Sequence, residues 1–245
     1  MGVGLRFLWG APAAALVAWV AIRLGWLRGD GAVAAAVVGL GIYGFGGLRA
    51  AGVLLAFFLT ATLVGKLPRG PKHGPRDARQ VIANGGVAVL GALLLALRVP
   101  LGVAVLAGAL ASANADTWAT EIGTRYGGAP RRLGFGPRLS ARDSGGMTVI
   151  GTLGGGAGAA LIAVLAGGWP AVIGGVAGMA ADSLLGGTLQ AVYRCPACGQ
   201  RLEQRRHGCG VAADRVRGLP WMDNDAVNLM ATVIGAVVTT ALVAR

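Results

Sequence analysis

Charged side chains are scarce in this chain of 245 residues, and acidic ones are the scarcest. Asp, Glu, Lys and Arg together make up 13% of the sequence, which is about half of their share in an ordinary soluble domain. Hydrophobic residues reach 55%. This composition excludes a typical water-soluble domain and predicts an integral membrane protein.

Cysteine is also rare, and its 3 copies are clustered near residue 200. An odd number in one short segment argues against a disulfide framework. The chain also lacks the Gly-Lys-Ser/Thr spacing of a P-loop, which excludes that kind of nucleotide site. The net charge of +12 lies in short loops and not in a basic, aromatic-interleaved domain. We therefore expect a membrane protein that follows the positive-inside rule, with no nucleic acid partner.

Apolar runs close to the bilayer-spanning length recur from end to end of the chain, and each is long enough for a helix to cross the membrane. They predict an all-α transmembrane bundle of about eight spans, forming a single domain over residues 1–245. The first run is interpreted as a retained helix, since no clear small-residue cleavage site follows it. The glycine-rich segment IYGFGGLRAAG predicts that the second and third spans form a broken pair. The expected spans are residues 7–27, 31–48, 50–65, 81–97, 100–122, 146–167, 170–193 and 224–243.

Lysine and arginine gather in three long connections, after the third, fifth and seventh expected spans. The opposite connections and the two termini hold few of them. The positive-inside rule then places the three long loops in the cytoplasm and both termini outside. The expected location is the inner or plasma membrane of a prokaryote, with the active face in the cytoplasm.

Three carboxylates fall inside stretches that otherwise suit lipid: Asp116, Glu121 and Asp182. Such residues are expensive in a bilayer and usually face a cavity with a function. Asp116 and Glu121 are about 140° apart around a helix, and hard oxygen ligands of this kind suit Mg²⁺. The alternatives are an interhelical hydrogen-bond cluster paired to an arginine, and for Asp182 a small-residue packing face with one buried acid.

A second group of polar residues marks the entry to the last expected span. Asp223, Asn224, Asp225 and Asn228 lie in PWMDNDAVNLM. Asp225 and Asn228, three residues apart, share a helix face. Asp and Asn are also ordinary helix caps, so a functional role and a capping role both stay open for the individual acids.

Two further segments have features of phosphate sites. Arg79 and Asn84 lie in RDARQVIANGG, where an arginine and a helix N-terminus could bind a phosphate. Arg142, Ser144 and Thr148 lie in ARDSGGMT, a glycine-rich turn whose backbone N–H groups could face an anion. Neither segment alone is strong evidence for a phosphate site. The alternative for RDARQVIANGG is ordinary positive charge in a loop beside the membrane.

The cysteines carry a separate prediction. Cys195, Cys198, His207 and Cys209 lie in CPACGQRLEQRRHGCG, which supplies the four soft ligands of a small structural zinc site within residues 195–210. Four protein ligands leave no open position, so catalytic zinc is not expected. Unliganded thiols and a redox CxxC are the alternatives.

Taken together, RDARQVIANGG, ADTWATEIG, DSGGMT, DSLLGGTLQ, YRCPACG and DNDAVN resemble a membrane family, long of unknown function, that includes the chloroplast phytyl-phosphate kinase. The similarity extends from about residue 30 to the end. ADTWATEIGTRYG is more distantly similar to the acidic segment of phosphatidate cytidylyltransferase, dolichol kinase and phytol kinase. The Lys-Arg and His-Gly-Gly signatures of the cytidylyltransferases are missing, which favours the kinase branch.

The resemblance implies Mg²⁺-dependent phosphoryl transfer from a nucleoside triphosphate, with CTP expected, to an isoprenyl monophosphate of the phytyl or geranylgeranyl type. Membrane lipid is an expected contact, and a homo-oligomer stays open. The rival functions are a lipid-phosphate cytidylyltransferase and an ion-coupled transporter. The expected catalytic acids are Asp116, Asp182, Asp225 and Glu121, the first three holding Mg²⁺. The expected substrate-binding residues are Arg79, Asn84, Arg142, Ser144, Thr148, Asn224 and Asn228.

Overall fold

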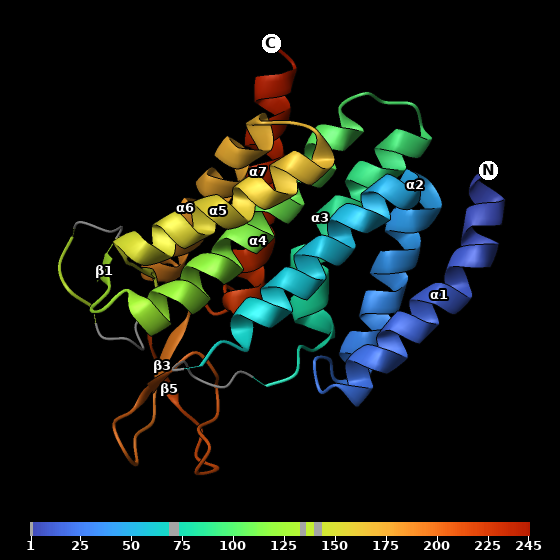
Figure 1. Ribbon diagram of the computed structural model, residues 1–245. Coiled ribbons are helices and arrows are strands. Elements are labelled where there is room, and N and C mark those ends of the chain that lie inside the picture. Colours follow the sequence, from blue (N-terminus) through green and yellow to red (C-terminus); the bar gives the residue numbers. More distant parts are fainter. Residues whose placement is uncertain (1, 69–73, 133–135, 140–143) are drawn as a thin grey trace.

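The computed structural model describes residues 2–68, 74–132, 136–139 and 144–245, and within these ranges the chain is mostly helical (Figure 1). All the helices except α4 are long and apolar enough to cross a membrane. The helices are α1 (Val3–Arg23), α2 (Gly29–Gly65), α3 (Ala78–Ala96), α4 (Gly102–Tyr126), α5 (Val149–Ala166), α6 (Pro170–Thr188) and α7 (Asn224–Val243).

The expected helical bundle is confirmed, and six of its helices qualify as membrane spans by length and composition. The last expected span, 224–243, coincides with α7. A count of eight would require α4 and both arms of α2 to cross separately, so that count stays a prediction. The polar end of α4 carries Asp116, Glu121 and Arg125, which sets this helix apart from the six.

The 37-residue helix α2 is broken at Gly47, where φ is 75° and ψ is −167°. An L residue with a side chain rarely adopts such a positive φ, so glycine permits the sharp reversal here. The two arms fold back beside each other (Figure 1), and a Cβ on Gly39 would lie 4.0 Å from Leu54. The break falls inside the glycine-rich segment that predicted a broken pair.

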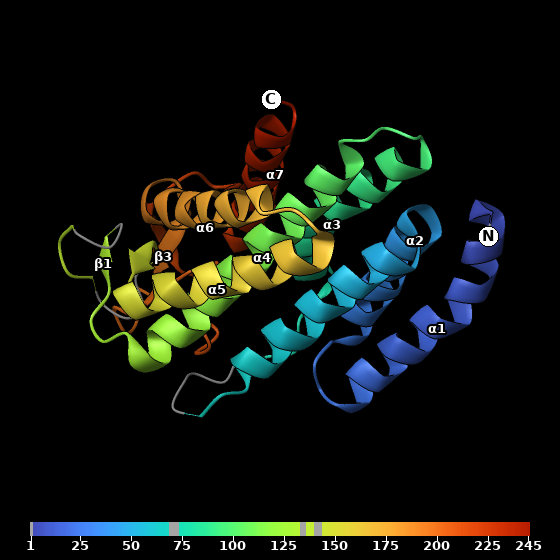
Figure 2. The same cartoon turned by 45° about the horizontal axis from the view of Figure 1, so that its top comes forward.

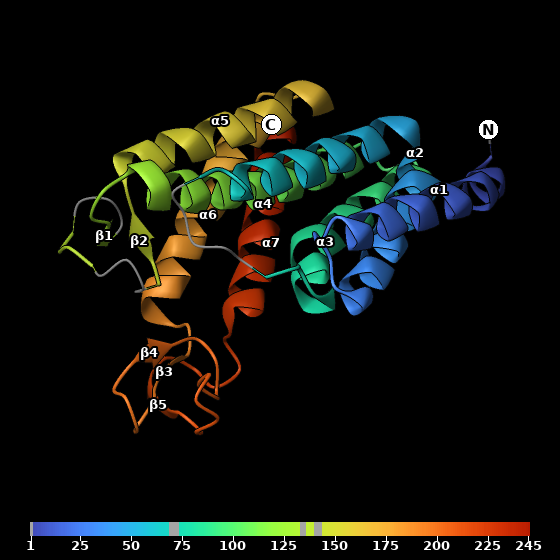
Figure 3. The same cartoon turned by 60° about the horizontal axis from the view of Figure 1, so that its bottom comes forward.

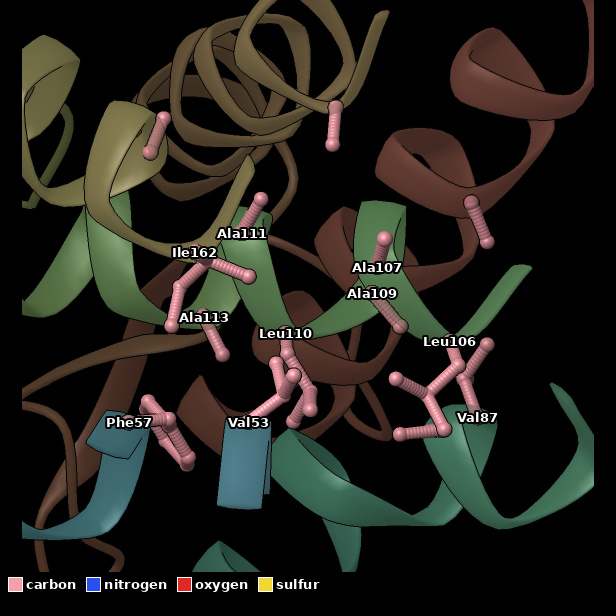
Figure 4. Close-up of a cluster of buried hydrophobic side chains, with 14 of the residues drawn as sticks. Val53, Phe57, Val87, Leu106, Ala107, Ala109, Leu110, Ala111, Ala113 and Ile162 are labelled. Atoms are coloured by element: carbon pink, nitrogen blue, oxygen red, sulfur yellow. The ribbon is translucent and has the colours of Figure 1, made fainter. Parts of the chain in front are cut away.

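Helix α4 is the centre of the bundle, in contact with α2, α3, α5, α6 and α7 (Figure 2). Most of its buried residues are small, and Leu106 and Leu110 are the two large apolar ones. Val53 and Phe57 of α2, with Ile162 of α5, pack around these residues (Figure 4). Small side chains let helix backbones approach closely. In lipid, where burial of apolar surface between helices gives no hydrophobic stabilisation, this close packing holds the helices together.

Two buried polar side chains of α4, Asn114 and Ser112, form hydrogen bonds to neighbouring helices. The side chain of Asn114 donates to the carbonyl O of Gly158 at 2.8 Å and accepts from Thr60 at 3.3 Å. Ser112 donates to the carbonyl O of Ala231 at 2.9 Å. These bonds join α4 to α2, α5 and α7, so the hydrogen-bond-cluster alternative raised for the α4 motif applies to Asn114.

The all-α expectation needs a correction, because two small antiparallel sheets accompany the helices. β1 (Arg131–Arg132) pairs with β2 (Gly146–Met147). β3 (Val192–Arg194), β4 (Arg201–Leu202) and β5 (Asp214–Arg217) form a sheet in the order β4-β3-β5. This second sheet, with the cysteine segment, stands outside the helical bundle (Figure 3).

Three expected spans extend well past the helices of the structure. The span 7–27 ends at Arg23, because Trp26 lies in the connection to α2. The span 170–193 ends at Thr188 in the structure, because Val192 and Tyr193 pair with β5 and with β4. The span 146–167 begins only at Val149, because Thr148 caps the helix and accepts from Gly151 N–H. Apolar runs extend past these helix ends, and periodicity alone cannot separate a helix end from an adjoining strand.

The outer helix faces carry large exposed apolar side chains, among them Leu153 and Val164 of α5 and Leu8 of α1. Such faces suit lipid rather than water. Both chain termini lie away from the β3–β5 sheet (Figures 1 and 3). We call the sheet-bearing end of the bundle the loop side.

Candidate functional site

A cavity of about 980 Å³ opens on the loop side of the bundle. Its walls come from α2 to α7 and from the connections before α2, α3, α5 and α7. Most predicted site residues in the described part of the chain line it. They are Asp116, Glu121, Asp182, Asp225, Arg79, Asn84, Ser144, Thr148, Asn224 and Asn228.

Asp116 of α4 and Asp182 of α6 face this cavity from two packed helices. Their carboxylates are close enough to repel each other, and Glu203 adds a further negative charge that acts on Asp182. Oδ2 of Asp182 is buried without a hydrogen-bond partner among the described residues. A buried oxygen of this kind beside a second carboxylate is unfavourable unless a cation or proton joins them. The pair therefore has the chemistry of a divalent-cation site.

Glu121 has a different environment. Its carboxylate forms an ion pair with Arg125 one helical turn away, and the Arg125 side chain is 1% exposed. Arg125 also donates to the carbonyl O atoms of Gly65 and Leu67 at the end of α2. Glu121 thus helps to fasten α4 to α2, and the structure does not present it as a lone ligand beside Asp116.

Arg79 joins the starts of α3 and α7. Its guanidinium lies 2.6 Å from Oδ2 of Asp223 and 3.6 Å from Oδ2 of Asp225. Asp223 also caps α7 by accepting from the N–H of Ala226. The capping role foreseen for this cluster is present for Asp223, while Asp225 lines the cavity beside Arg79.

Three helices begin at the cavity wall: α3, α5 and α7. Their caps are Asp77, Thr148 and Asp223, and all three caps line the cavity. The first turns of a helix offer backbone N–H groups and a positive dipole end to an anion. The caps of α3 and α7 are carboxylates that offset part of this positive charge, whereas the cap of α5 is the neutral Thr148. The loop-side cavity therefore combines carboxylates from α4 and α6 with three helix N-termini.

The glycine-rich turn before α5 packs on α6. A Cβ on Gly145 would collide with the backbone of Gly187 and the carbonyl O of Ser183. The hydroxyl of Ser144 donates to Glu203 at 2.6 Å. This turn joins the DSGG and DSLLGG segments, so its main visible role is packing. Arg142, the other arginine predicted there, lies outside the described residues.

Several cavity residues were not singled out from sequence, among them Trp26, Thr62, Lys66 and Arg76. Lys66 and Arg76 had been counted only as positive loop charge, and Trp26 had been placed in the first span. The sequence contains one hint that Arg76 belongs to the site: it lies three residues before Arg79, which was singled out. These four residues lie close together because the second arm of α2 returns toward the connection between α1 and α2. Local sequence does not show this return.

The cysteine segment forms two tight turns beside the β3–β5 sheet. The ligand atoms of Cys195, His207 and Cys209 all lie within 4.8 Å of one another, a group that could hold a metal ion. The two Sγ atoms of Cys195 and Cys209 are 3.7 Å apart. Cys198 is outside this group of three, although its Sγ lies 3.7 Å from Nδ1 of His207.

The surroundings of this group also suit a metal. Burial acts to raise the pKa of the Cys195 thiol, but hydrogen bonds from the backbone of Cys198 and Ala197 and from the Cys198 and Cys209 side chains bring that pKa below its usual value. Nε2 of His207 lies 3.0 Å from Oε1 of Gln200. A partner on the second ring nitrogen orients a ligating histidine.

An apolar helical bundle with a polar cavity at one end defines an integral membrane protein. Residues 12–236 match the family described as integral membrane protein DUF92, and the chain belongs to this family. It is also 26% identical over 226 residues to an uncharacterized membrane protein of Methanocaldococcus jannaschii, a match that covers 86% of this chain and 84% of that protein. No solved structure matches the chain significantly. The predicted membership of a membrane family is confirmed, while the predicted relation of this family to lipid-phosphate kinases stays a prediction.

Proposed function

We propose that the protein transfers the terminal phosphoryl group of a nucleoside triphosphate, with CTP the expected donor, to an isoprenyl monophosphate in the membrane. One observation supports this most. Asp116 and Asp182 converge, with an unpartnered carboxylate oxygen, in a cavity that three helix N-termini and three arginines also line. Phosphoryl transfer depends almost entirely on positioning and charge neutralisation, and these groups supply both.

The reaction needs little help from a base. An oxygen of the acceptor phosphate forms a bond to the γ-phosphorus of the triphosphate. The bond from that phosphorus to the β,γ-bridging oxygen breaks, and the nucleoside diphosphate leaves with the electron pair. An ionised phosphate is already a nucleophile, so the site requires no residue that removes a proton.

The side chains of the cavity have distinct roles in this proposal. Asp116 and Asp182 would hold Mg²⁺, which neutralises charge on the triphosphate and orients its oxygens. The amides of Asn84, Asn224 and Asn228 donate to phosphate oxygens near the starts of α3 and α7. Arg79, held by Asp223 and Asp225, keeps these two helix starts together. The isoprenoid tail lies along the Gly/Ala-rich helices, where the bilayer gives it access.

Labelled CTP tests the reaction directly. We expect purified protein with Mg²⁺ and geranylgeranyl monophosphate to transfer label from the γ-phosphate of CTP to the lipid. Transfer from the α-phosphate would instead identify a cytidylyltransferase. Transfer from neither position, across prenyl phosphates of graded length and several nucleotides, would refute the enzyme proposal and leave a transporter as the alternative.

The cysteine group is proposed to hold structural zinc. Two thiolates on a tetrahedral zinc are about 3.8 Å apart, given a Zn–S bond of about 2.3 Å, and the Cys195–Cys209 separation of 3.7 Å matches this. Cys198 would complete the set through a small shift toward the metal. Arg205 donates to the carbonyl O of Pro220 at 3.0 Å, and both residues line the cavity. Zinc would thus stabilise one wall of the site.

We expect about one zinc per chain in protein purified without chelators, and less than about a tenth of that in Cys195→Ser, because a site with three ligands binds much more weakly. Elemental analysis of the purified protein measures both. Gly208→Ala is the matched control, since a Cβ at Gly208 meets nothing within 4 Å, and it should retain zinc. Wild-type protein without zinc would exclude the site.

A further inference from the structure

One corner of the cavity contains hydrogen-bond donors and cationic side chains to which the proposed reaction assigns no role. It lies where the connection between α1 and α2 meets the end of α2 and the start of α3. We call it the Trp26 corner and define it by four residues, Trp26, Thr62, Lys66 and Arg76, all of which line the cavity.

Backbone hydrogen bonds and one aromatic contact hold this corner in place. The N–H of Arg76 donates to the carbonyl O of Trp26 at 3.1 Å, and the N–H of Arg28 donates to the carbonyl O of Arg76 at 2.9 Å. The Trp26 ring packs on Phe58, with centroids 5.9 Å apart. These contacts fix the position of Trp26 and Arg76, so the corner is formed before any ligand binds.

The side chains of the corner offer donors with few acceptors. Nε1 of Trp26 is buried and has no hydrogen-bond partner among the described residues. The Arg76 guanidinium donates to the Thr62 hydroxyl at 3.2 Å, and Lys66 Nζ lies 4.8 Å from the Trp26 ring centroid. A buried indole N–H usually finds an acceptor, so an anion bound beside Trp26 would satisfy this group.

The charge balance of the corner favours an anion. Burial lowers the pKa of Arg76, and the charge of Glu121 opposes this only in part. Glu121 itself is in an ion pair with Arg125. A bound anion would stabilise the half-buried guanidinium through charge-assisted hydrogen bonds.

We propose that the Trp26 corner binds the phosphate group of the isoprenyl monophosphate, through the indole N–H of Trp26 and the side chains of Arg76 and Lys66. This inference rests on the proposed function, and it separates the acceptor phosphate from the nucleotide. The nucleotide occupies the part of the cavity that contains Asp116 and Asp182.

Two observations favour the acceptor over the nucleotide in this corner. A triphosphate needs a divalent cation, and the paired carboxylates that suit one lie on α4 and α6, whereas a lipid phosphate can be neutralised by cationic side chains alone. The corner also adjoins α1, of which only 17% is buried in the bundle, so a lipid tail reaches the bilayer there.

The relative positions of the Trp26 corner and of the Asp116–Asp182 pair fit a transfer reaction. Arg76 is near enough to Glu121 to feel its charge. Glu121 and Asp116 are five residues apart on α4, about 7.5 Å along the helix axis. The residues proposed for the acceptor phosphate and for the metal therefore line one cavity.

Binding without turnover tests this inference apart from the reaction. The full-length protein in phosphatidylcholine nanodiscs is titrated with geranylgeranyl monophosphate, geranylgeraniol or inorganic phosphate, with no nucleotide present. We expect the monophosphate alone to bind well. Arg76→Gln should weaken its binding at least about tenfold, and Trp26→Phe, which keeps an aromatic ring, by roughly three- to tenfold. Mg²⁺–CTP binding should change less than about twofold.

Arg28→Gln is the matched control, since Arg28 is a neighbouring exposed arginine that pairs with Asp30 at 3.4 Å and does not line the cavity. It should bind the lipid phosphate as the wild type does. Equal loss in Arg28→Gln, weakened CTP binding in Trp26→Phe, or equal binding of inorganic phosphate would each overturn the assignment. If binding behaves as expected but labelled CTP yields no transfer, the corner stands and the proposed reaction fails.

Discussion

Asp116→Asn is expected to remove Mg²⁺-dependent phosphoryl transfer, lowering the rate at least about a thousandfold. A metal ion contributes several kcal/mol to the stabilisation of charge in the transition state, and each 1.36 kcal/mol corresponds to a factor of about ten in rate. The amide keeps the shape of the side chain but removes the negative charge that, together with Asp182, would hold the cation. The measurement is the initial rate of label transfer from γ-labelled CTP.

A change of fold would not explain this loss, because Asp116 lines a cavity and its replacement removes repulsion from Asp182. The variant should therefore melt at or above the temperature of the wild type. Asp214→Asn is a suitable control: Asp214 is exposed on β5 and does not line the cavity. Undiminished turnover in folded Asp116→Asn would refute the metal assignment.

Gly174→Leu is expected to prevent stable assembly of the bundle, with a loss of more than about 3 kcal/mol from overpacking. A Cβ at this position would collide with Oγ1 of Thr239 and would lie 2.5 Å from the carbonyl O of Gly235. Gly108 of α4 meets the same two residues, so three helices cross here at backbone contact. No rotamer change can make room, because Gly235 presents backbone. The yield and melting temperature of detergent-purified protein measure the effect.

Gly156→Leu provides the comparison for this substitution. Gly156 lies on α5, and a Cβ there would meet nothing within 4 Å. Both variants add the same side chain to a glycine inside an apolar helix, and only one of them adds it at a crossing. A Gly174→Leu protein as stable as Gly156→Leu would mean that α6 and α7 do not cross as described.

Composition and local pattern were sufficient for much of this architecture. The apolar runs predicted the helices, and the glycine-rich segment around residue 47 predicted a break in α2. The pattern failed where helices end, at Thr188 and Val149, because the apolar runs continue past the cap or into short strands. The small sheet β4-β3-β5 was missed because strands of two to four residues have no readable periodicity.

The sequence likewise predicted some residues of the candidate site and missed others. Asp116 and Asp182 were recognised because a carboxylate is conspicuous in an apolar segment. Trp26 and Arg76 were not, because a tryptophan or arginine near a helix end is ordinary in a membrane protein. Two ion pairs of the site also differ in whether the sequence could have predicted them: Arg79 with Asp223, and Glu121 with Arg125. The second is a contact one helical turn apart, while the first joins residues 144 positions apart.

By itself, the sequence determined that this chain is a helical membrane protein with acids inside apolar segments, since both properties depend only on which residues follow one another. The tertiary structure alone decided which of these acids face each other and which are held by arginines. It also brought Trp26, Lys66 and Arg76 to one corner of the cavity. Those distances depend on the three-dimensional path of the chain: the reversal at Gly47 returns the end of α2 toward the start of α3, and close crossings such as that at Gly174 join segments far apart in the chain.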